Sequence, residues 1–182
     1  KKHIMEAANE NRRYMPSHMT QEDFMDVFGG VYEHTPWIAE AVYAAGLTGS
    51  QDTVAGLHDS LRTNVDDADD EKKLALLRAH PDLAGKLAIS GELTADSTSE
   101  QASAQLDKCT PEEFAEFQSL NDRYKEAFGF PYILAVRGRN RQEILENFRS
   151  RVDNTPDTEF AEALKQVHRI ALLRIEALFQ EK

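Results

Sequence analysis

Helix-start signals recur along the whole chain and constrain its fold more than any other feature. The capping-box pattern, a Ser, Thr or Asn followed three residues later by Glu, predicts helices that begin near Ser97, Thr110 and Asn140. Further starts are predicted at Thr20, Pro36, Ser50, Asp66 or Asp67, and Thr155. The strand-like run Phe130–Val136 is too short and solitary to form a sheet. We therefore predict an all-α, single-domain bundle of about seven or eight helices, with a short extended segment near Phe130–Val136.

Length and composition favour one domain with ordinary soluble character. A chain of 182 residues suits a single domain, and residues 1–16 are polar without a sustained period, which is typical of an N-terminal tail or a tag remnant. Residues 17–182 then form the helical domain. The net charge of −11 disfavours a phosphate backbone, so no nucleic-acid partner is expected.

The sequence also predicts a cytoplasmic protein. It has no apolar run of the roughly 18 residues that a membrane helix needs, so no membrane partner is expected. It shows neither a signal-peptide core nor a C-terminal peroxisomal signal. The lone Cys109 fits a reducing compartment.

A histidine precedes a proline where a helix must stop. The segment Glu71–Ala79 reads as a helix, and Pro81 disfavours helical backbone for the residue before it. His80 is thus predicted at a helix C-terminus, with an ordinary pKa near 6.5 that suits proton transfer. The alternative is that His80 only complements the helix dipole.

The last helix carries an arginine on its apolar face. At about 100° per residue, Arg174 falls within the stripe that contains Val167, Ala171 and Ile175. A guanidinium there needs an anion, a dense set of hydrogen bonds or a route to solvent. It either binds an anionic substrate or pairs with an internal carboxylate. His168, at the edge of the stripe, is interpreted as structural.

Two further segments could carry polar contacts. Ser97–Gln101 combines hydroxyl, carboxylate and amide groups at a predicted helix start, where a cap is the simpler interpretation. The extended segment near Phe130–Val136 would leave backbone groups that a ligand can satisfy. The six histidines and the single cysteine show no metal-ligand spacing, so no metal is expected.

Taken in order, these segments resemble the 2-oxo-4-hydroxy-4-carboxy-5-ureidoimidazoline (OHCU) decarboxylases of the urate-to-allantoin pathway. The resembling runs are His80–Lys86, Glu92–Gln101, Phe128–Arg137, the terminal helix with Arg174, and Phe28–Trp37. The resemblance implies an all-helical, cofactor-free homodimer that converts a small ureidoimidazoline substrate, OHCU, to (S)-allantoin and CO2.

The resemblance also implies site residues. His80 matches the catalytic histidine, with Glu100 and Arg174 as its polar partners. The substrate-binding positions carried over are Pro81, Ser97, Thr98, Ser99, Glu100, Gln101, Tyr132, Ile133, Leu134, Ala135 and Val136. Tyr132 stands where Phe is commoner in the family, a change that should be tolerated.

Two alternatives remain open at this point. The run from Lys72 to Asp82 is similar to the helix and His-Pro-Asp loop of a J-domain co-chaperone, although acidic residues open its helix where that interaction needs a basic face. A related decarboxylase or hydrolase acting on another ureide would share the same pocket, because one pocket contact discriminates by only about 1–3 kcal/mol.

Overall fold

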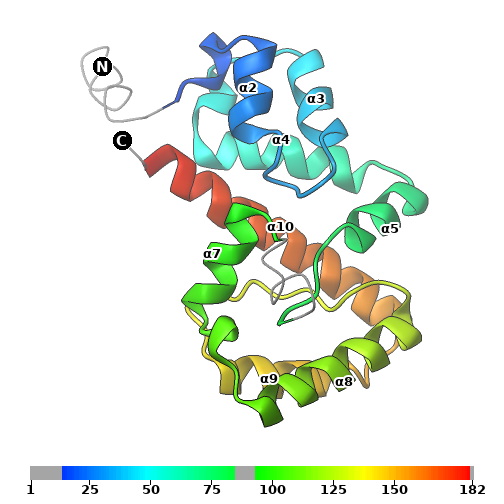
Figure 1. The fold of residues 1–182 in the computed structure, drawn as a ribbon. Coiled ribbons are helices and arrows are strands. Elements are labelled where there is room, and N and C mark those ends of the chain that lie inside the picture. Colours follow the sequence, from blue (N-terminus) through cyan, green and yellow to red (C-terminus); the bar gives the residue numbers. More distant parts are fainter. Residues whose placement is uncertain (1–13, 85–92, 181–182) are drawn as a thin grey trace. The chain divides into compact units, whose positions relative to one another are not determined.

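The computed structural model describes residues 14–84 and 93–180, and this part of the chain contains helices and connecting segments but no strand. Its eight α-helices are α2 (Gln21–Phe28), α3 (Trp37–Ala44), α4 (Val54–Asp66), α5 (Asp70–Arg78), α7 (Ala95–Ser103), α8 (Pro111–Phe128), α9 (Arg141–Arg151) and α10 (Pro156–Gln180). Three 3-10 helices accompany them: η1 (Pro16–His18), η2 (Gly49–Asp52) and η3 (Leu106–Lys108). The predicted all-α class is confirmed for these residues (Figure 1).

The chain divides into two compact units. The first unit comprises residues 1–76 and 168–182, and the second comprises residues 77–167. Helices α5 and α10 each contribute residues to both units, because each contains a boundary between them.

Aromatic and aliphatic side chains form the core of the first unit. Helix α3 contacts both α2 and α4, and these three helices can be followed in Figure 1. Phe24, Leu57 and Leu61 are at most 1% exposed. The ring of Phe28 lies 5.8 Å from that of Phe179 on α10, which ties the last turns of the chain to this core.

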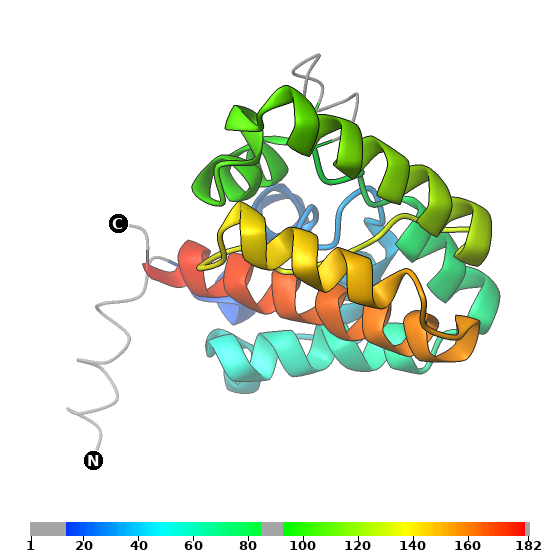
Figure 2. The same cartoon turned by 90° about the horizontal axis from the view of Figure 1, so that it is seen from below.

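The core of the second unit is built around Tyr124 on α8. Its ring contacts those of Phe128, Phe130, Tyr132 and Phe148. Helices α8 and α9 contact one another, and both are visible in Figure 2. Apolar burial of this kind supplies the main stabilisation of a helical domain.

Side-chain caps define most helix starts. Thr20, Thr110 and Asn140 cap α2, α8 and α9 as predicted, and the Thr110–Glu113 capping box is complete in both directions. The predicted start at Ser50 is wrong for α4, because Ser50 lies in η2 and Thr53 accepts the capping hydrogen bond from Gly56.

The predicted start at Asp66 or Asp67 is also wrong. Asp66 is the last residue of α4, and the Oδ1 atom of Asp69 accepts from the N–H of Lys72, 2.8 Å away, at the start of α5. Several acidic residues in a row offer alternative caps, so the sequence alone did not select among them.

Part of the segment predicted as a tail packs against the first unit. Pro16 is buried, and the ring of Tyr14 meets that of Phe28 edge to face at 5.9 Å. Ser17 donates from both its N–H and its hydroxyl to the carboxylate of Asp52, over 2.8 and 2.6 Å. Residues 1–13 lie outside the described part of the chain.

Candidate active site

Helix α5 ends just before His80, as predicted. Its last residue is Arg78, and the N–H of His80 reaches back to the carbonyl of Leu77 over 3.3 Å in a final turn. His80 and Pro81 are both partly exposed. The imidazole is therefore placed at a helix end where solvent and a small ligand can reach it.

Three side-chain amides hold the loop that follows His80. Gln101 donates to the carbonyl of Asp82 over 3.3 Å and accepts from the N–H of Ala84 over 3.1 Å. Asn121 donates to the carbonyl of Leu83, and Gln118 donates to that of Ala84, over 3.0 and 2.8 Å. We call these three side chains, Gln101, Gln118 and Asn121, the amide clamp.

The amide clamp stabilises an unusual backbone conformation. Ala84 has a φ of 50°, in the left-handed region that a residue with a Cβ rarely adopts. Both backbone hydrogen-bonding groups of Ala84 are bound by the clamp, which offsets the cost of this conformation. An ion pair between Lys125 and Asp82, 2.6 Å apart, attaches the same loop to α8.

Removing one member of the clamp should loosen the loop. In Asn121→Ala the buried carbonyl of Leu83 loses its donor, which costs about 1–3 kcal/mol of unfolding free energy. We also expect a lower kcat with little change in KM. Asn64→Ala removes a comparable amide–carbonyl contact within α4 and should leave kcat unchanged. Urea unfolding and steady-state kinetics test both; equal kcat values for wild type and Asn121→Ala would contradict the positional role.

The interpretation of Ser97 as a helix cap is wrong. Helix α7 begins at Ala95, and Thr94 caps it by accepting from the N–H of Ser97 over 3.2 Å. Ser97 and Gln101 lie one turn apart and are both buried, whereas Thr98 and Ser99 are exposed. Glu100 is partly exposed on the adjacent face. The second unit thus brings Gln101, at the end of the predicted polar segment, into contact with the loop after His80.

The predicted extended segment is present and buried. Residues 131–136 lie between α8 and α9 without regular structure, and Tyr132, Ile133 and Leu134 are at most 3% exposed. Side chains, rather than a neighbouring strand, bind its backbone. Arg151 donates to the carbonyl of Ile133, and Gln166 accepts from the N–H of Ala135 over 3.0 Å.

Some backbone donors of this segment stay unused. Within the described part of the chain, the N–H groups of Ile133, Leu134 and Val136 make no hydrogen bond. A buried N–H group is costly to leave unpaired, so these donors are available to a hydrogen-bond acceptor. The hydroxyl of Tyr132 is already bound, because it donates to Asn147, and burial raises the pKa of that hydroxyl. The predicted substrate contact of Tyr132 concerns its backbone groups and stays a prediction.

Arg174 is buried on α10, as its place in the apolar stripe predicted. Its side chain is 3% exposed, and its Nη2 atom lies 3.0 Å from the Oε1 atom of Glu33, whose side chain is 2% exposed. Its Nη1 atom donates to the carbonyl of Val31 over 3.2 Å. The internal carboxylate that the sequence left open is therefore Glu33. Sequence reasoning did not single out Glu33, which directly follows the apolar pair Val31–Tyr32.

Three side chains of the first unit form a polar network around the buried His168. Its Nδ1 atom lies 2.7 Å from the hydroxyl of Tyr32, and its Nε2 atom lies 3.1 Å from Oδ1 of Asp66. His58 reaches the backbone carbonyl of His168 over 3.0 Å. Burial lowers the pKa of both His168 and His58, and Asp66 opposes this in the case of His168. The interpretation of His168 as structural agrees with these contacts.

This network makes stability depend on pH. The folded-state pKa of His168 lies below its unfolded value, so the unfolded chain binds more protons as the pH falls below about 6.5. The free energy of unfolding should therefore decrease from pH 7 to pH 5. We expect a shallower decrease in His168→Gln, measured by urea unfolding at a series of pH values. The exposed His18 supplies the control His18→Gln, which should keep the wild-type slope; an unchanged slope in His168→Gln would contradict the assignment.

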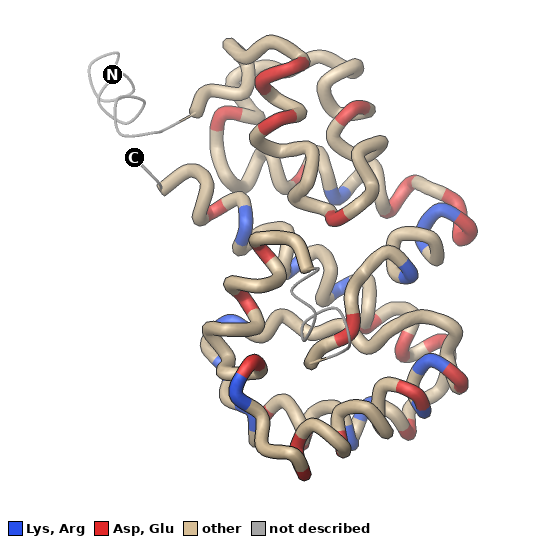
Figure 3. Tube along the Cα trace, in the orientation of Figure 1, with Lys and Arg blue, Asp and Glu red and all other residues tan. Residues whose placement is uncertain are grey.

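Outside this region, the described residues include an acidic cluster but no group arranged to hold a metal ion. Acidic residues gather at the junction of α4 and α5, and Figure 3 shows this stretch as red tube followed by a blue stretch, which contains Lys72 and Lys73. Among the described residues, no group of His, Cys, Asp or Glu is arranged to hold a metal ion. Likewise, none of the described helices has the length and apolar content to cross a membrane.

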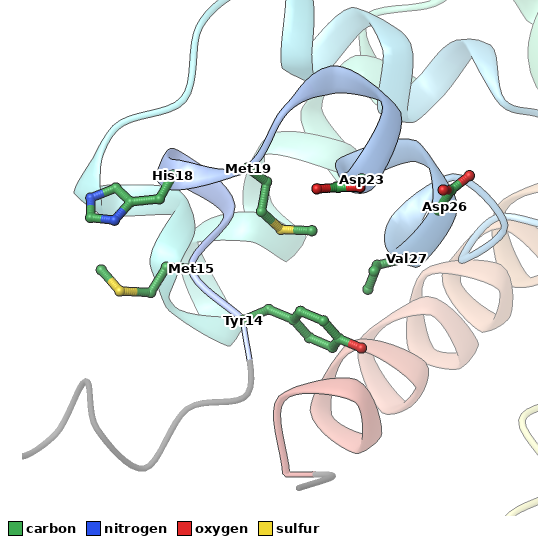
Figure 4. A pocket seen from close by; sticks show the side chains of 7 residues that line it. All are labelled: Tyr14, Met15, His18, Met19, Asp23, Asp26 and Val27. Carbon is green, nitrogen blue, oxygen red and sulfur yellow. The ribbon is translucent and has the colours of Figure 1, made fainter.

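A cavity of about 420 Å³ in the first unit lies away from every predicted site residue that this unit contains (Figure 4). Its lining consists of Tyr14, Met15, His18, Met19, Asp23, Asp26 and Val27. The lining includes an imidazole and two carboxylates, but the ring of His18 points away from Asp23 and Asp26 in Figure 4. None of the residues predicted to bind the substrate or to transfer a proton lines this cavity.

Comparisons with known proteins place this arrangement in a family. Residues 17–176 match the model of the OHCU decarboxylase family. The OHCU decarboxylase of Haloferax volcanii is 41% identical over 164 residues, covering 90% of this chain and 94% of that protein. The mouse protein of the same name is 36% identical over 156 residues, covering 84% of each chain.

Solved structures agree. The crystal structure of an (S)-allantoin synthase superposes with a TM-score of 0.71 at 31% identity, covering 90% of this chain and 52% of that one. An OHCU decarboxylase crystallised in the presence of (S)-allantoin shares the fold, with a TM-score of 0.66 at 22% identity, over 89% of this chain and 100% of that one.

A helical fold with these relatives defines an enzyme of the carboxy-lyase class that acts in urate degradation. More narrowly, the chain belongs to the OHCU decarboxylase family. The co-chaperone alternative is thereby set aside, since it explained one helix and a tripeptide, whereas the family match spans residues 17–176.

Proposed function

We propose that this chain converts OHCU to (S)-allantoin and CO2, and that His80 is the residue that moves the proton. The main observation behind the proposal is that hydrogen bonds fix the backbone next to His80. A titratable ring stands at the end of α5, and the backbone immediately after it is bound by four hydrogen bonds from the amide clamp. Catalytic groups need such fixed surroundings, because small displacements of a reacting group are costly.

The substrate itself explains why no cofactor is expected. In OHCU one ring carbon carries both the hydroxyl and the carboxyl group. When the carbon–carboxyl bond breaks, its electron pair moves into the ring toward the adjacent C=N group. The hydroxyl proton leaves as that carbon becomes a carbonyl, and a proton is added to the neighbouring carbon that bears the ureido group. His80 would accept the first proton and supply the second, as a general base and then a general acid.

The other predicted residues have complementary roles in the proposal. Glu100 would accept hydrogen bonds from the ureido or ring N–H groups, and Arg174 would bind the carboxylate or a ring oxygen. Backbone groups of Tyr132–Val136 would fix the ring face that receives the proton, and so give the S product. Pro81 and Ser97–Gln101 complete the proposed substrate contacts.

The test is an assay of the purified protein on freshly generated OHCU. Circular dichroism follows the chiral product, and we expect (S)-allantoin to form much faster than in buffer alone. A rate equal to the spontaneous rate, or racemic product, would contradict the proposal. Addition of a chelator should leave the rate unchanged, since the mechanism uses no metal; a chelator-sensitive rate would contradict that part of it.

The homodimer and the cytoplasmic location implied by the resemblance remain predictions. Sedimentation or light scattering of the purified chain tests the dimer, with a particle of twice the 20.5 kDa chain mass as the expected result.

A further inference from the structure

Three consecutive residues between α2 and α3 attach to the same helix. The carbonyl of Val31 accepts from Arg174, the hydroxyl of Tyr32 meets His168, and the carboxylate of Glu33 pairs with Arg174. All these residues belong to the first unit and are at most 6% exposed. The last part of α10 and this connection therefore form one buried polar contact, with Arg174 near its centre.

We propose that Glu33 is a positioning residue for Arg174, and that it also moderates the attraction of Arg174 for small anions. The proposal rests on the function proposed above, in which Arg174 binds the substrate. It concerns a residue that does not itself take part in proton transfer.

The positioning argument follows from the geometry. Two nitrogen atoms of the planar guanidinium are bound by residues two apart in the chain, Nη1 by Val31 and Nη2 by Glu33, over 3.2 and 3.0 Å. Because the guanidinium group is rigid and planar, two contacts fix both its orientation and its position. Loss of the Glu33 contact would remove one of these two fixed points and so loosen the orientation of the plane.

The charge argument follows from burial. A guanidinium with a side-chain exposure of 3% needs a counter-charge, and Glu33 supplies one that is permanently part of the chain. An arginine paired with a carboxylate attracts a second anion less than an unpaired one does. Inorganic phosphate or sulfate should therefore compete poorly with the substrate as long as Glu33 is charged.

The experiment compares Glu33→Gln with Glu33→Asp in steady-state kinetics on OHCU, with inorganic phosphate as the inhibitor. Glu33→Gln keeps an oxygen near Nη2 but removes the charge. We expect kcat to fall by about tenfold or more, as for loss of a hydrogen bond to a charged group, and phosphate to inhibit at a clearly lower concentration. Glu33→Asp keeps the charge but withdraws the carboxylate by one methylene group. It should lower kcat while leaving the phosphate inhibition constant at the wild-type value.

A merely structural role would give a different result. In that case the melting temperature of Glu33→Gln would fall, while kcat per folded molecule and the phosphate inhibition constant would match wild type; this overturns the proposal. If Glu33→Gln does not fold, Glu33→Asp decides the positioning role, and an unchanged kcat would overturn it. The exposed carboxylate Glu116, paired with Arg149, supplies the control Glu116→Gln, which should keep wild-type kinetics.

A further variant separates this inference from the function it rests on. Arg174→Lys keeps a charge beside Glu33 but loses the planar fork. If Arg174→Lys retains the wild-type kcat/KM, Arg174 does not bind substrate and the proposed function fails at that residue. If Arg174→Lys is impaired while Glu33→Gln and Glu33→Asp are not, only the role of Glu33 is overturned.

Discussion

Replacing His80 with Asn is expected to lower kcat for OHCU decarboxylation by a factor of about 100 to 10,000, the usual contribution of one acid–base group. Asparagine keeps a polar group near the position of the Nδ1 atom of histidine but cannot exchange a proton near neutral pH. Because His80 is partly exposed and lies beyond the last residue of α5, the substitution should leave the melting temperature almost unchanged. KM should change little if the ring does not contribute to ground-state binding.

The matched control is His18→Asn. His18 is also exposed, and it also lies at the end of a short helical segment, η1. We expect wild-type turnover from this variant when (S)-allantoin is followed by circular dichroism. Near-wild-type, stereospecific turnover in His80→Asn would remove His80 from the mechanism.

The largest effect on stability is expected at the buried ion pair of the second unit. Nε of Arg151 lies 2.9 Å from Oε1 of Glu159, and their side chains are 5% and 0% exposed. Glu159 also accepts from Tyr124 and Asn154. Glu159→Ala leaves the guanidinium buried without its counter-charge, and should cost about 3–5 kcal/mol of unfolding free energy in urea titrations.

Glu116→Ala is the appropriate comparison, because its pair with Arg149 lies at the surface, with side-chain exposures of 35% and 56%. The expected cost there is at most about 1 kcal/mol. Similar losses in Glu159→Ala and Glu116→Ala would show that burial does not govern the strength of the Arg151 pair. Since Arg151 also binds the carbonyl of Ile133, weaker substrate binding should accompany the loss of stability.

The sequence predicted where the helices lie, but it did not predict the starts of α4, α5 and α7. The pattern from Ser97 to Glu100 satisfies the capping rule locally, yet Thr94 is the cap of α7. The reason lies in tertiary structure, since a helix beginning at Ala95 turns both Ser97 and Gln101 toward the interior. At α4 the predicted start, Ser50, lies inside η2, and the cap is Thr53, three residues further along the chain.

A sequence pattern could not identify the residues that pair with the predicted polar residues. Periodicity placed Arg174 on a buried face, which is correct, but a period defines a face and not the residue opposite it. Glu33 lies 141 positions away along the chain. The same limit applies to the amide clamp, since Gln118 and Asn121 read as ordinary polar positions of an amphipathic helix.

The composition of the amide clamp has a consequence for kinetic measurements. Gln101, Gln118 and Asn121 carry carboxamides, which neither gain nor lose protons between acid and alkaline pH. The backbone after His80 is therefore anchored by groups whose hydrogen bonding is the same at every pH where the chain is folded. The amide clamp itself should thus add no ionisation to a pH–rate profile of this enzyme, whereas the Lys125–Asp82 pair on the same loop contains ionisable groups.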